Sequence, residues 1–191
     1  MTVRVMLISP ATSTDLRAAR FGSDAPLSPA GLAAAGAAAA GCPGADRAWA
    51  APTRRCGGTA DALGLDAPAD PALADLDTGA WRGRTLDEVA AEDPAALGLW
   101  LADPAAAPHG GESVLDLVAR VGDWLTERQG RVLAVVEPAV VRAAVVHALA
   151  LPPHLFWRLD VAPLTLTRLT GAAGRWNLTC GSPLTPQRPT G

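Results

Sequence analysis

Short stretches with strand character alternate along this chain with helical segments. The strand-like stretches cover residues 3–8, 45–50 and 131–136, and two more, 164–169 and 175–180, follow the last helix. The first, VRVMLI, is mostly β-branched and aliphatic, as is typical of a central strand buried on both faces of a parallel sheet. The alternation predicts a three-layer α/β/α sandwich with a mostly parallel central sheet.

The helical segments carry start and stop signals. Ser28 and Pro29 supply an N-cap and a first-turn proline for a helix that Gly41 ends. Ser113 and Asp116 resemble a capping box and begin a helix that runs to about residue 128. Further helices are expected over residues 54–63, 86–91, 94–101 and 139–149.

The length of 191 residues is that of one ordinary domain. We expect a single domain over residues 1–181, followed by a tail, 182–191, with the composition of a disordered end. The net charge is −3 and the basic residues are scattered, so we expect no nucleic-acid partner.

The cysteines and the N-terminus bear on the compartment. Cys42, Cys56 and Cys180 are odd in number and lack a Cys-x-x-Cys spacing, which argues against a disulfide framework and a zinc site. The N-terminus lacks a charged segment followed by a hydrophobic region, and the alanine run near residue 37 is too short to span a bilayer. We therefore expect a cytoplasmic protein with no membrane association, no metal and no cofactor.

Five segments, in their order and approximate spacing, resemble the histidine phosphatase superfamily, whose members are phosphoglycerate-mutase-like. They are RFGSDAPLSPAG at 20–31, Arg54-Arg55 before Thr59-Ala60, LADLDTGAWRG at 73–83, GGES at 110–113 and VVRAAVVHALAL at 140–151. The resemblance covers nearly the whole chain. It implies the sandwich fold and, in working members, phosphoryl transfer through a histidine at the end of the first strand.

The same resemblance identifies this chain as a degenerate member that lacks both catalytic histidines. The first histidine and the arginine before it fall on Pro10 and Ser9, and the second histidine falls on Glu137. The arginine before the Thr-Ala pair is kept as Arg55, and the acid that protonates the leaving oxygen falls on Asp75. The resemblance thus predicts a retained scaffold from which phosphate chemistry has been lost.

Elementary electrostatics leads to the same expectation. At about 4 Å, two unit charges interact with about 4 kcal/mol at an effective dielectric constant near 20. Ser9 in place of an arginine removes one such attraction for phosphate, and Glu137 adds a repulsion. Pro10 and Pro138 lack the N–H groups from which anion-binding turns are built.

The chain has three histidines, His109, His147 and His154. We expect each to be a surface or packing residue, because His147 lies well inside a helix and His154 in a proline-rich turn. His109 is the candidate exception, since its loop could fold over the pocket.

Arg55, Asp75 and Glu137 are expected to converge on one pocket at the strand ends. One interpretation is a repurposed site in which Asp75 and Glu137 act as acid and base beside Arg55. The other is that Arg55 pairs with Glu137 or Asp75 and so fills the former phosphate site.

Six further residues are candidate binding groups. Arg20 either approaches a ligand or anchors its loop by pairing with Asp24; Glu112 either caps a helix or contacts a ligand; and Trp81 packs or binds. Ser9, Pro10 and Thr12 lie at the first strand's end, where no histidine is at hand to activate a hydroxyl.

Three functions follow from different classes. The first is a pseudophosphatase that binds a small molecule or a protein partner. The sequence also allows a homodimer. The second is a repurposed lyase, isomerase, cyclase or hydrolase that uses Asp75, Glu137 and Arg55. The third is a residual phosphatase or mutase.

Overall fold

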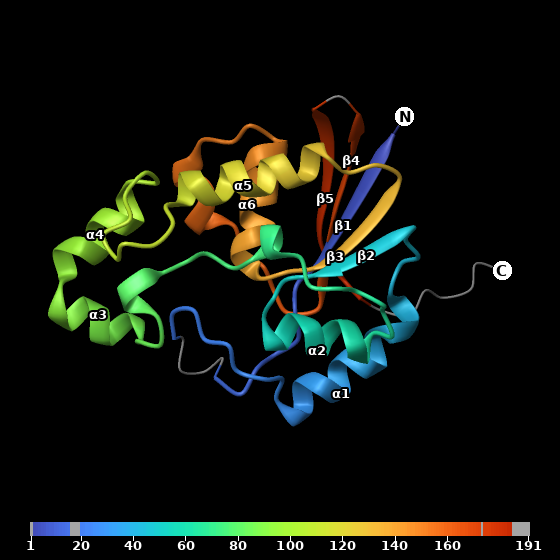
Figure 1. The fold of residues 1–191 in the computed structure, drawn as a ribbon, viewed down its shortest axis with the longest axis horizontal. Coiled ribbons are helices and arrows are strands. Elements are labelled where there is room, and N and C mark those ends of the chain that lie inside the picture. The colour runs from blue at the N-terminus through green and yellow to red at the C-terminus, as the bar shows by residue number, and fades with distance from the viewer. Residues whose placement is uncertain (1, 16–19, 173, 185–191) are drawn as a thin grey trace.

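A computed structural model describes residues 2–15, 20–172 and 174–184 of the chain. Five strands form one sheet in the order β2-β3-β1-β4-β5. Helices α1 (Pro29–Ala38) and α2 (Arg54–Ala62) lie on one side of it, and α5 (Val114–Thr126) and α6 (Pro138–Ala148) on the other (Figure 1). The expected α/β sandwich is confirmed.

The three core strands are parallel and bring their carboxyl ends to one edge. β1 (Val3–Ile8) and β2 (Arg47–Ala50) both pair with β3 (Arg131–Val135). Ile8 and Ala50 both lie opposite Val135, so the residues that follow the three strands meet at the same place. This edge carries the candidate site, as expected for a parallel α/β sheet.

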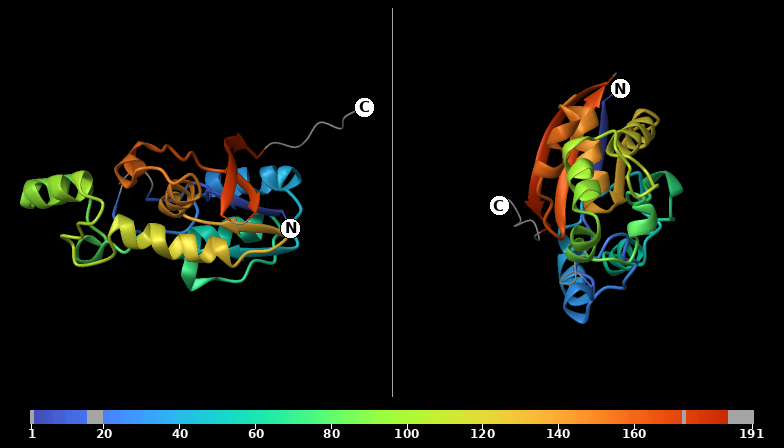
Figure 2. Two further views of the ribbon diagram at one scale, coloured as in Figure 1. Left: turned by 90° about the horizontal axis from the view of Figure 1, so that it is seen from above. Right: turned by 90° about the vertical axis from the view of Figure 1, so that its left-hand side faces the viewer.

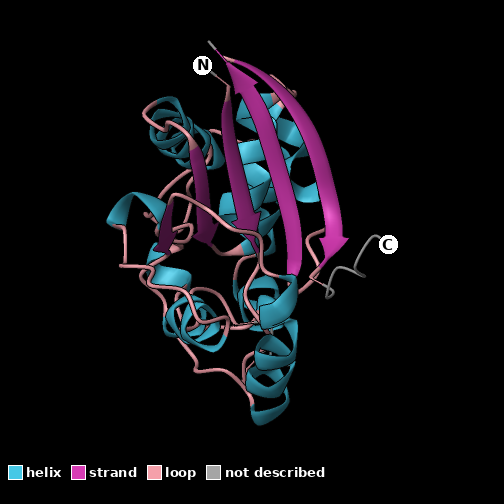
Figure 3. Cartoon of the chain, turned by 90° about the vertical axis from the view of Figure 1, so that its right-hand side faces the viewer, coloured by secondary structure: helices cyan, strands magenta, loops and turns pink. Residues whose placement is uncertain are grey.

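The last two strands extend the sheet with antiparallel pairing. β4 (Thr165–Ala172) pairs with β1, and β5 (Arg175–Pro183) pairs with β4 (Figure 3). Both are longer than the sequence predicts, because an antiparallel hairpin tolerates polar residues on an exposed face. Pro183 lies opposite Thr165, so the ordered chain continues past the expected boundary at residue 181. The rest of the expected tail, 185–191, lies outside the described residues.

Polar side chains cap the helices where the sequence predicts them. Ser28 accepts a hydrogen bond from the Gly31 N–H at 3.0 Å, and Ser113 forms a capping box with Asp116. The remaining short helices are η2 (Ala39–Gly41), η3 (Pro71–Leu73), η4 (Gly79–Trp81), α3 (Leu86–Glu92), α4 (Pro94–Ala102) and η5 (Pro153–Arg158).

Helices α3 and α4 form an arm that extends away from the sheet (Figure 2). Aromatic rings join this arm to the body: Trp100 of α4 lies 5.5 Å from Trp81 and 4.3 Å from Trp157, measured between ring centroids. Edge-to-face and offset contacts of this kind stabilise aromatic clusters beyond their buried area. Among the described residues, no helix is both long and apolar enough to cross a membrane.

Candidate functional site

The side chains of Arg55 and Glu137 meet where β2 and β3 end. Glu137 follows β3 and is the N-terminal capping residue of α6, while Arg55 lies in the first turn of α2. The Arg55 Nε–H donates to Glu137 Oε1 at 2.8 Å, and the Nη2 group pairs with Oε2. Of the two pairings that the sequence allows for Arg55, the structure has the one with Glu137.

Glu137 is almost completely buried, with 1% of its surface exposed. Thr53 donates its hydroxyl hydrogen to Oε1 at 2.7 Å, and the thiol of Cys56 lies 3.5 Å from the same atom. A buried carboxylate is stable only when its oxygens are paired and hydrogen-bonded, as both are here. Neither Thr53 nor Cys56 is among the site residues expected from the sequence; the available signal for Thr53 is its place as an N-cap directly before Arg54-Arg55.

Burial and the charge of Glu137 shift the pKa values of Arg55 and Cys56. Burial disfavours the charge on Arg55, but the hydrogen bond and the charge of Glu137 outweigh it and raise the pKa of the guanidinium. Burial, reinforced by the charge of Glu137, raises the pKa of the Cys56 thiol well above its usual range. Cys56 is therefore a neutral, unreactive thiol.

Asp75 is the second carboxyl group near Arg55. Burial and the charge of Glu137 raise its pKa to about 7, against the opposing Leu76 N–H, Arg55 and Arg120. Asp75 lines a cavity of about 170 Å³ together with Ser13, Asp15, Arg20, Gly22, Ser23 and Arg55. It also lines a more open cavity of about 440 Å³ with Asp77, Glu112 and Arg120 among others.

Ser9 and Pro10 directly follow β1, and the Ser9 hydroxyl has partners within the chain. Ser9 is 1% exposed; its hydroxyl donates to the Ala162 carbonyl at 2.5 Å and accepts from the Thr165 N–H at 3.0 Å. The next amide, that of Ala11, donates to the Thr59 hydroxyl at 3.0 Å. These bonds fix the chain after β1 to β4 and to α2.

Thr12 and Arg20 differ from the roles expected of them. The Thr12 hydroxyl shares a 3.3 Å hydrogen bond with Ser28 and does not line the cavity beside Asp75. Arg20 lines that cavity but donates to the Gly83 carbonyl at 2.8 Å and lies 3.7 Å from Glu88. The expected pairing of Arg20 with Asp24 is wrong, because Asp24 accepts a hydrogen bond from the Arg54 N–H at 2.6 Å.

Trp81 and Glu112 also have structural partners. Trp81 is buried and packs against Phe21, Trp100 and His109. Glu112 accepts two hydrogen bonds of 2.8 Å from Arg120. Ser113, the next residue, is the N-cap of α5.

None of the three histidines reaches Arg55. His109 packs against Trp81 at 5.0 Å, and its Nδ1 accepts from the Gly111 N–H at 3.0 Å. Burial lowers the pKa of His109 against the opposing charge of Asp77. His147 packs against Gly122 of α5, and His154 is exposed on η5. The expectation of packing or surface roles holds for all three, and His109 does not cover the cavity.

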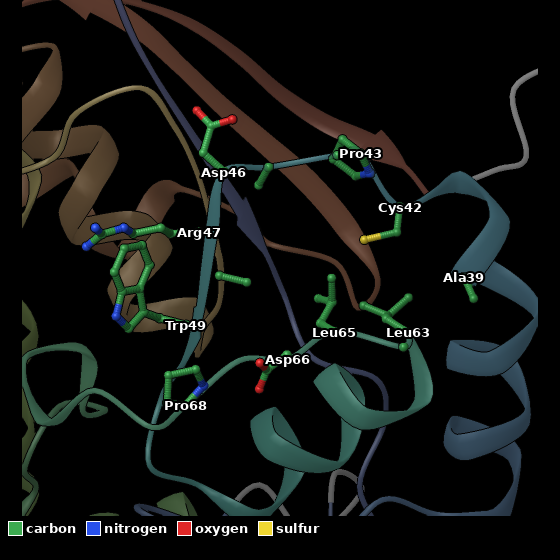
Figure 4. Close-up of a pocket in the computed structure, with 14 residues that line it drawn as sticks. Ala39, Cys42, Pro43, Asp46, Arg47, Trp49, Leu63, Leu65, Asp66 and Pro68 are labelled. Atoms are coloured by element: carbon green, nitrogen blue, oxygen red, sulfur yellow. The ribbon is translucent and has the colours of Figure 1, made fainter.

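A separate cavity of about 740 Å³ lies where η2, β2 and the end of α2 meet (Figure 4). Figure 4 shows Leu63 and Leu65 on one side of β2, and Arg47 and Trp49 on the other. This cavity shares no lining residue with the two cavities beside Asp75. The described residues hold no group of three or more His, Cys, Asp or Glu side chains that could bind a metal ion.

Comparison with known proteins identifies the family. The model of the histidine phosphatase superfamily, branch 1, matches residues 12–181. The chain belongs to this superfamily. The match covers all of the chain from the residue after Ala11 to the end of residue 181.

Solved structures of histidine phosphatases have the same fold. Mycobacterial glucosyl-3-phosphoglycerate phosphatase superposes with a TM-score of 0.82 at 25% identity, over 96% of this chain and 100% of that one. Phosphoserine phosphatase from Entamoeba histolytica has a TM-score of 0.81 at 17% identity, over 94% of this chain and 97% of that one, which shows the fold alone.

Curated mycobacterial sequences match a shorter segment. A bifunctional protein of Mycobacterium tuberculosis and an uncharacterized protein of Mycobacterium bovis are each 45% identical over 62 residues. The alignment covers 32% of this chain and 17% of either relative. This chain therefore has the fold of the superfamily, and at its strand ends the Glu137 carboxylate binds the Arg55 guanidinium.

Proposed function

We propose that this histidine phosphatase homologue performs no phosphohistidine chemistry and acts by binding a small molecule or a protein partner. The observation that carries the proposal is the ion pair of Glu137 with Arg55, in which the carboxylate accepts the hydrogen bonds that the guanidinium could otherwise donate to a ligand. A phosphate would need this same guanidinium, since Arg–phosphate and Arg–carboxylate pairs use the same fork of donors.

Phosphoryl transfer through a histidine needs an imidazole in line with the phosphate and cations around its oxygens. The positions assigned to the two imidazoles by resemblance hold Pro10 and Glu137. Arg55 is neutralised, and the Ala11 amide beside Pro10 is already bonded to Thr59. Nucleophile and phosphate-binding charge are thus both missing from the strand ends.

An assay for phosphate release tests the proposal. The native chain and an Arg55→Ala variant are incubated with a panel of phosphate monoesters, and protein-bound phosphate is sought by intact-protein mass spectrometry. We expect no release above the Arg55→Ala level and no phosphoryl adduct. Phosphate release by the native chain that Arg55→Ala abolishes, or a phosphorylated histidine, would overturn the proposal and indicate a residual phosphatase or mutase.

A repurposed acid/base enzyme is the second candidate, and Asp75 is the observation that favours it. A carboxyl group with a pKa of about 7 at a cavity wall can donate or accept a proton near neutral pH. Glu137 is unsuited to the role of its partner, because Arg55 and Thr53 occupy its oxygens.

The two candidates differ in what happens to a bound ligand. Compounds that stabilise the protein in a thermal-shift screen are incubated with it and then analysed by mass spectrometry. A binding protein returns them unchanged. An acid/base enzyme converts one of them, and Asp75→Asn then abolishes conversion while the thermal shift persists.

A further inference from the structure

A cavity of about 260 Å³ lies between α6, the segment 158–161 and the last two strands. Val141 and Val145 of α6 line one side, and Leu159 and Leu178 add further apolar wall. The cavity shares no lining residue with either cavity beside Asp75. It is a separate cavity, and an inference about it does not depend on the proposed function.

A buried hydroxyl group faces this cavity. Thr167 of β4 is 4% exposed and lines the cavity. Neighbouring Thr165 also lines it, but its hydroxyl donates to the Ala162 carbonyl at 2.8 Å. The Thr167 hydroxyl can donate one hydrogen bond to a group in the cavity.

Charged groups at the rim set the sign of the ligand. Arg142 and Arg158 supply two guanidinium groups against one carboxylate, Asp160. The Arg142 Nε–H donates to the Leu159 carbonyl at 2.7 Å, and Arg158 is exposed. The net charge of +1 suits one carboxylate better than a phosphate dianion, for which the remaining donors are too few.

We propose that this cavity, which we call the α6–β5 cavity, is a second binding site that accepts a small carboxylate with an apolar body. The apolar body packs between Val141, Val145 and Leu178, while the carboxylate accepts hydrogen bonds from Thr167 and the guanidinium of Arg158. Apolar walls with a few polar groups are typical of small-molecule sites, and about 260 Å³ is at the small end of their range.

Cys180 provides a local reporter, because it lines the α6–β5 cavity and its side chain is exposed. Alkylation of each cysteine by iodoacetamide is followed by mass spectrometry in the presence of hexanoate. Hexanamide and hexylamine, which have the same chain but no negative charge, serve as matched probes. Half-buried Cys42, outside this cavity, is the internal control.

Hexanoate is expected to slow the alkylation of Cys180 in a saturable manner and to leave that of Cys42 unchanged. Arg158→Gln should weaken this protection about tenfold, as for loss of a hydrogen bond to a charged group. Thr167→Val, which keeps the shape of the side chain, should weaken it about fivefold. Arg175→Gln, at the exposed β4–β5 turn, should leave it unchanged.

Absence of saturable protection of Cys180 by hexanoate would overturn the proposal. So would equal protection by hexanamide or hexylamine, or full protection in Arg158→Gln. Circular dichroism of each variant checks that the fold is retained, which is expected for Arg158→Gln because Arg158 is exposed.

Discussion

At the scale of single residues, the Glu137 carboxylate is the counter-ion of Arg55. Each of its oxygens accepts from Arg55, and Thr53 and Cys56 complete its surroundings. Two opposite charges close together in a nearly water-free site attract strongly, but each has lost its hydration. The pair therefore adds little to stability over an apolar pair, yet removal of one partner leaves a buried charge that is costly.

Glu137→Gln should consequently destabilise the protein by about 3 kcal/mol, because Arg55 keeps its charge and loses its counter-ion. Urea denaturation at neutral pH measures the change. The matched control is Glu112→Gln, which removes the carboxylate from the more exposed Arg120–Glu112 pair. That loss should be about 1 kcal/mol. Equal losses in the two variants would contradict a special role for the buried pair.

Ionisation of Asp75 destabilises the folded chain, because the pKa of this carboxyl group is raised by folding. Its pKa is about 7 in the folded chain, above the ordinary aspartate value of 3.8, so between these pH values the folded state binds more protons than the unfolded state. Stability from this group is fully present below about pH 4 and declines as the pH rises to 7. Asp75→Asn removes the decline and should be more stable than the native chain at pH 8 by up to about 4 kcal/mol.

Urea titrations at pH 4 and pH 8 measure this difference, which should vanish at the lower pH. Asp77→Asn is the matched control, because hydrogen bonds from the Gly79 N–H and Arg82 lower the pKa of Asp77. That variant should be less stable than the native chain at neutral pH, with the difference lost in acid. A pH-independent effect of Asp75→Asn would show that the carboxyl group is not protonated as described.

At the scale of elements, helices α5 and α6 pack through a glycine. A Cβ atom at Gly122 would lie 2.2 Å from Nδ1 of His147, far closer than atoms can approach. Alanine favours a helix over glycine by about 1 kcal/mol, so an exposed Gly122 would gain from the change. Here the clash decides the sign, because the rigid ring of His147 fills the space.

Gly122→Ala should therefore destabilise the protein by about 2 kcal/mol, as expected for overpacking. In a His147→Ala background the same change should be neutral or stabilising, since the ring is gone. Thermal or urea unfolding of the two single variants and the double variant forms a complete cycle. Additive effects in that cycle would mean that Gly122 and His147 do not meet.

The predictable and unpredictable parts of the structure differ in their physical origin. The meeting of Arg55 with Glu137 follows from the sequence, because the ends of neighbouring parallel strands lie together. The partners of Arg20 and Glu112 do not, because they depend on the course of irregular loops. Likewise, β5 extends to Pro183 through polar residues that carry no apolar strand signal.

At the scale of the whole molecule, an aromatic cluster docks the α3–α4 arm onto the body. Trp100 contributes the arm's side of the cluster and contacts Phe21, Trp81 and Trp157. Val89 of α3 and Leu97 of α4 are also buried, so the packing of the arm's apolar side chains, with Trp100 the largest of them, determines its protection against local opening.

Trp100→Leu should loosen the arm while the sheet stays closed. Hydrogen exchange followed by mass spectrometry should show faster exchange across residues 86–102, with β1 and β3 little changed. Uniformly faster exchange throughout the molecule would indicate instead that the arm and the sheet form one cooperative unit.

The most direct test of the central claim is calorimetric titration of the native chain with vanadate and with inorganic phosphate. Mycobacterial glucosyl-3-phosphoglycerate phosphatase, which has the same fold, forms complexes with VO3 and with inorganic phosphate. Since Glu137 already holds Arg55, the native chain should show no saturable binding of either anion at millimolar concentration. Saturable binding that Arg55→Ala abolishes would contradict the account.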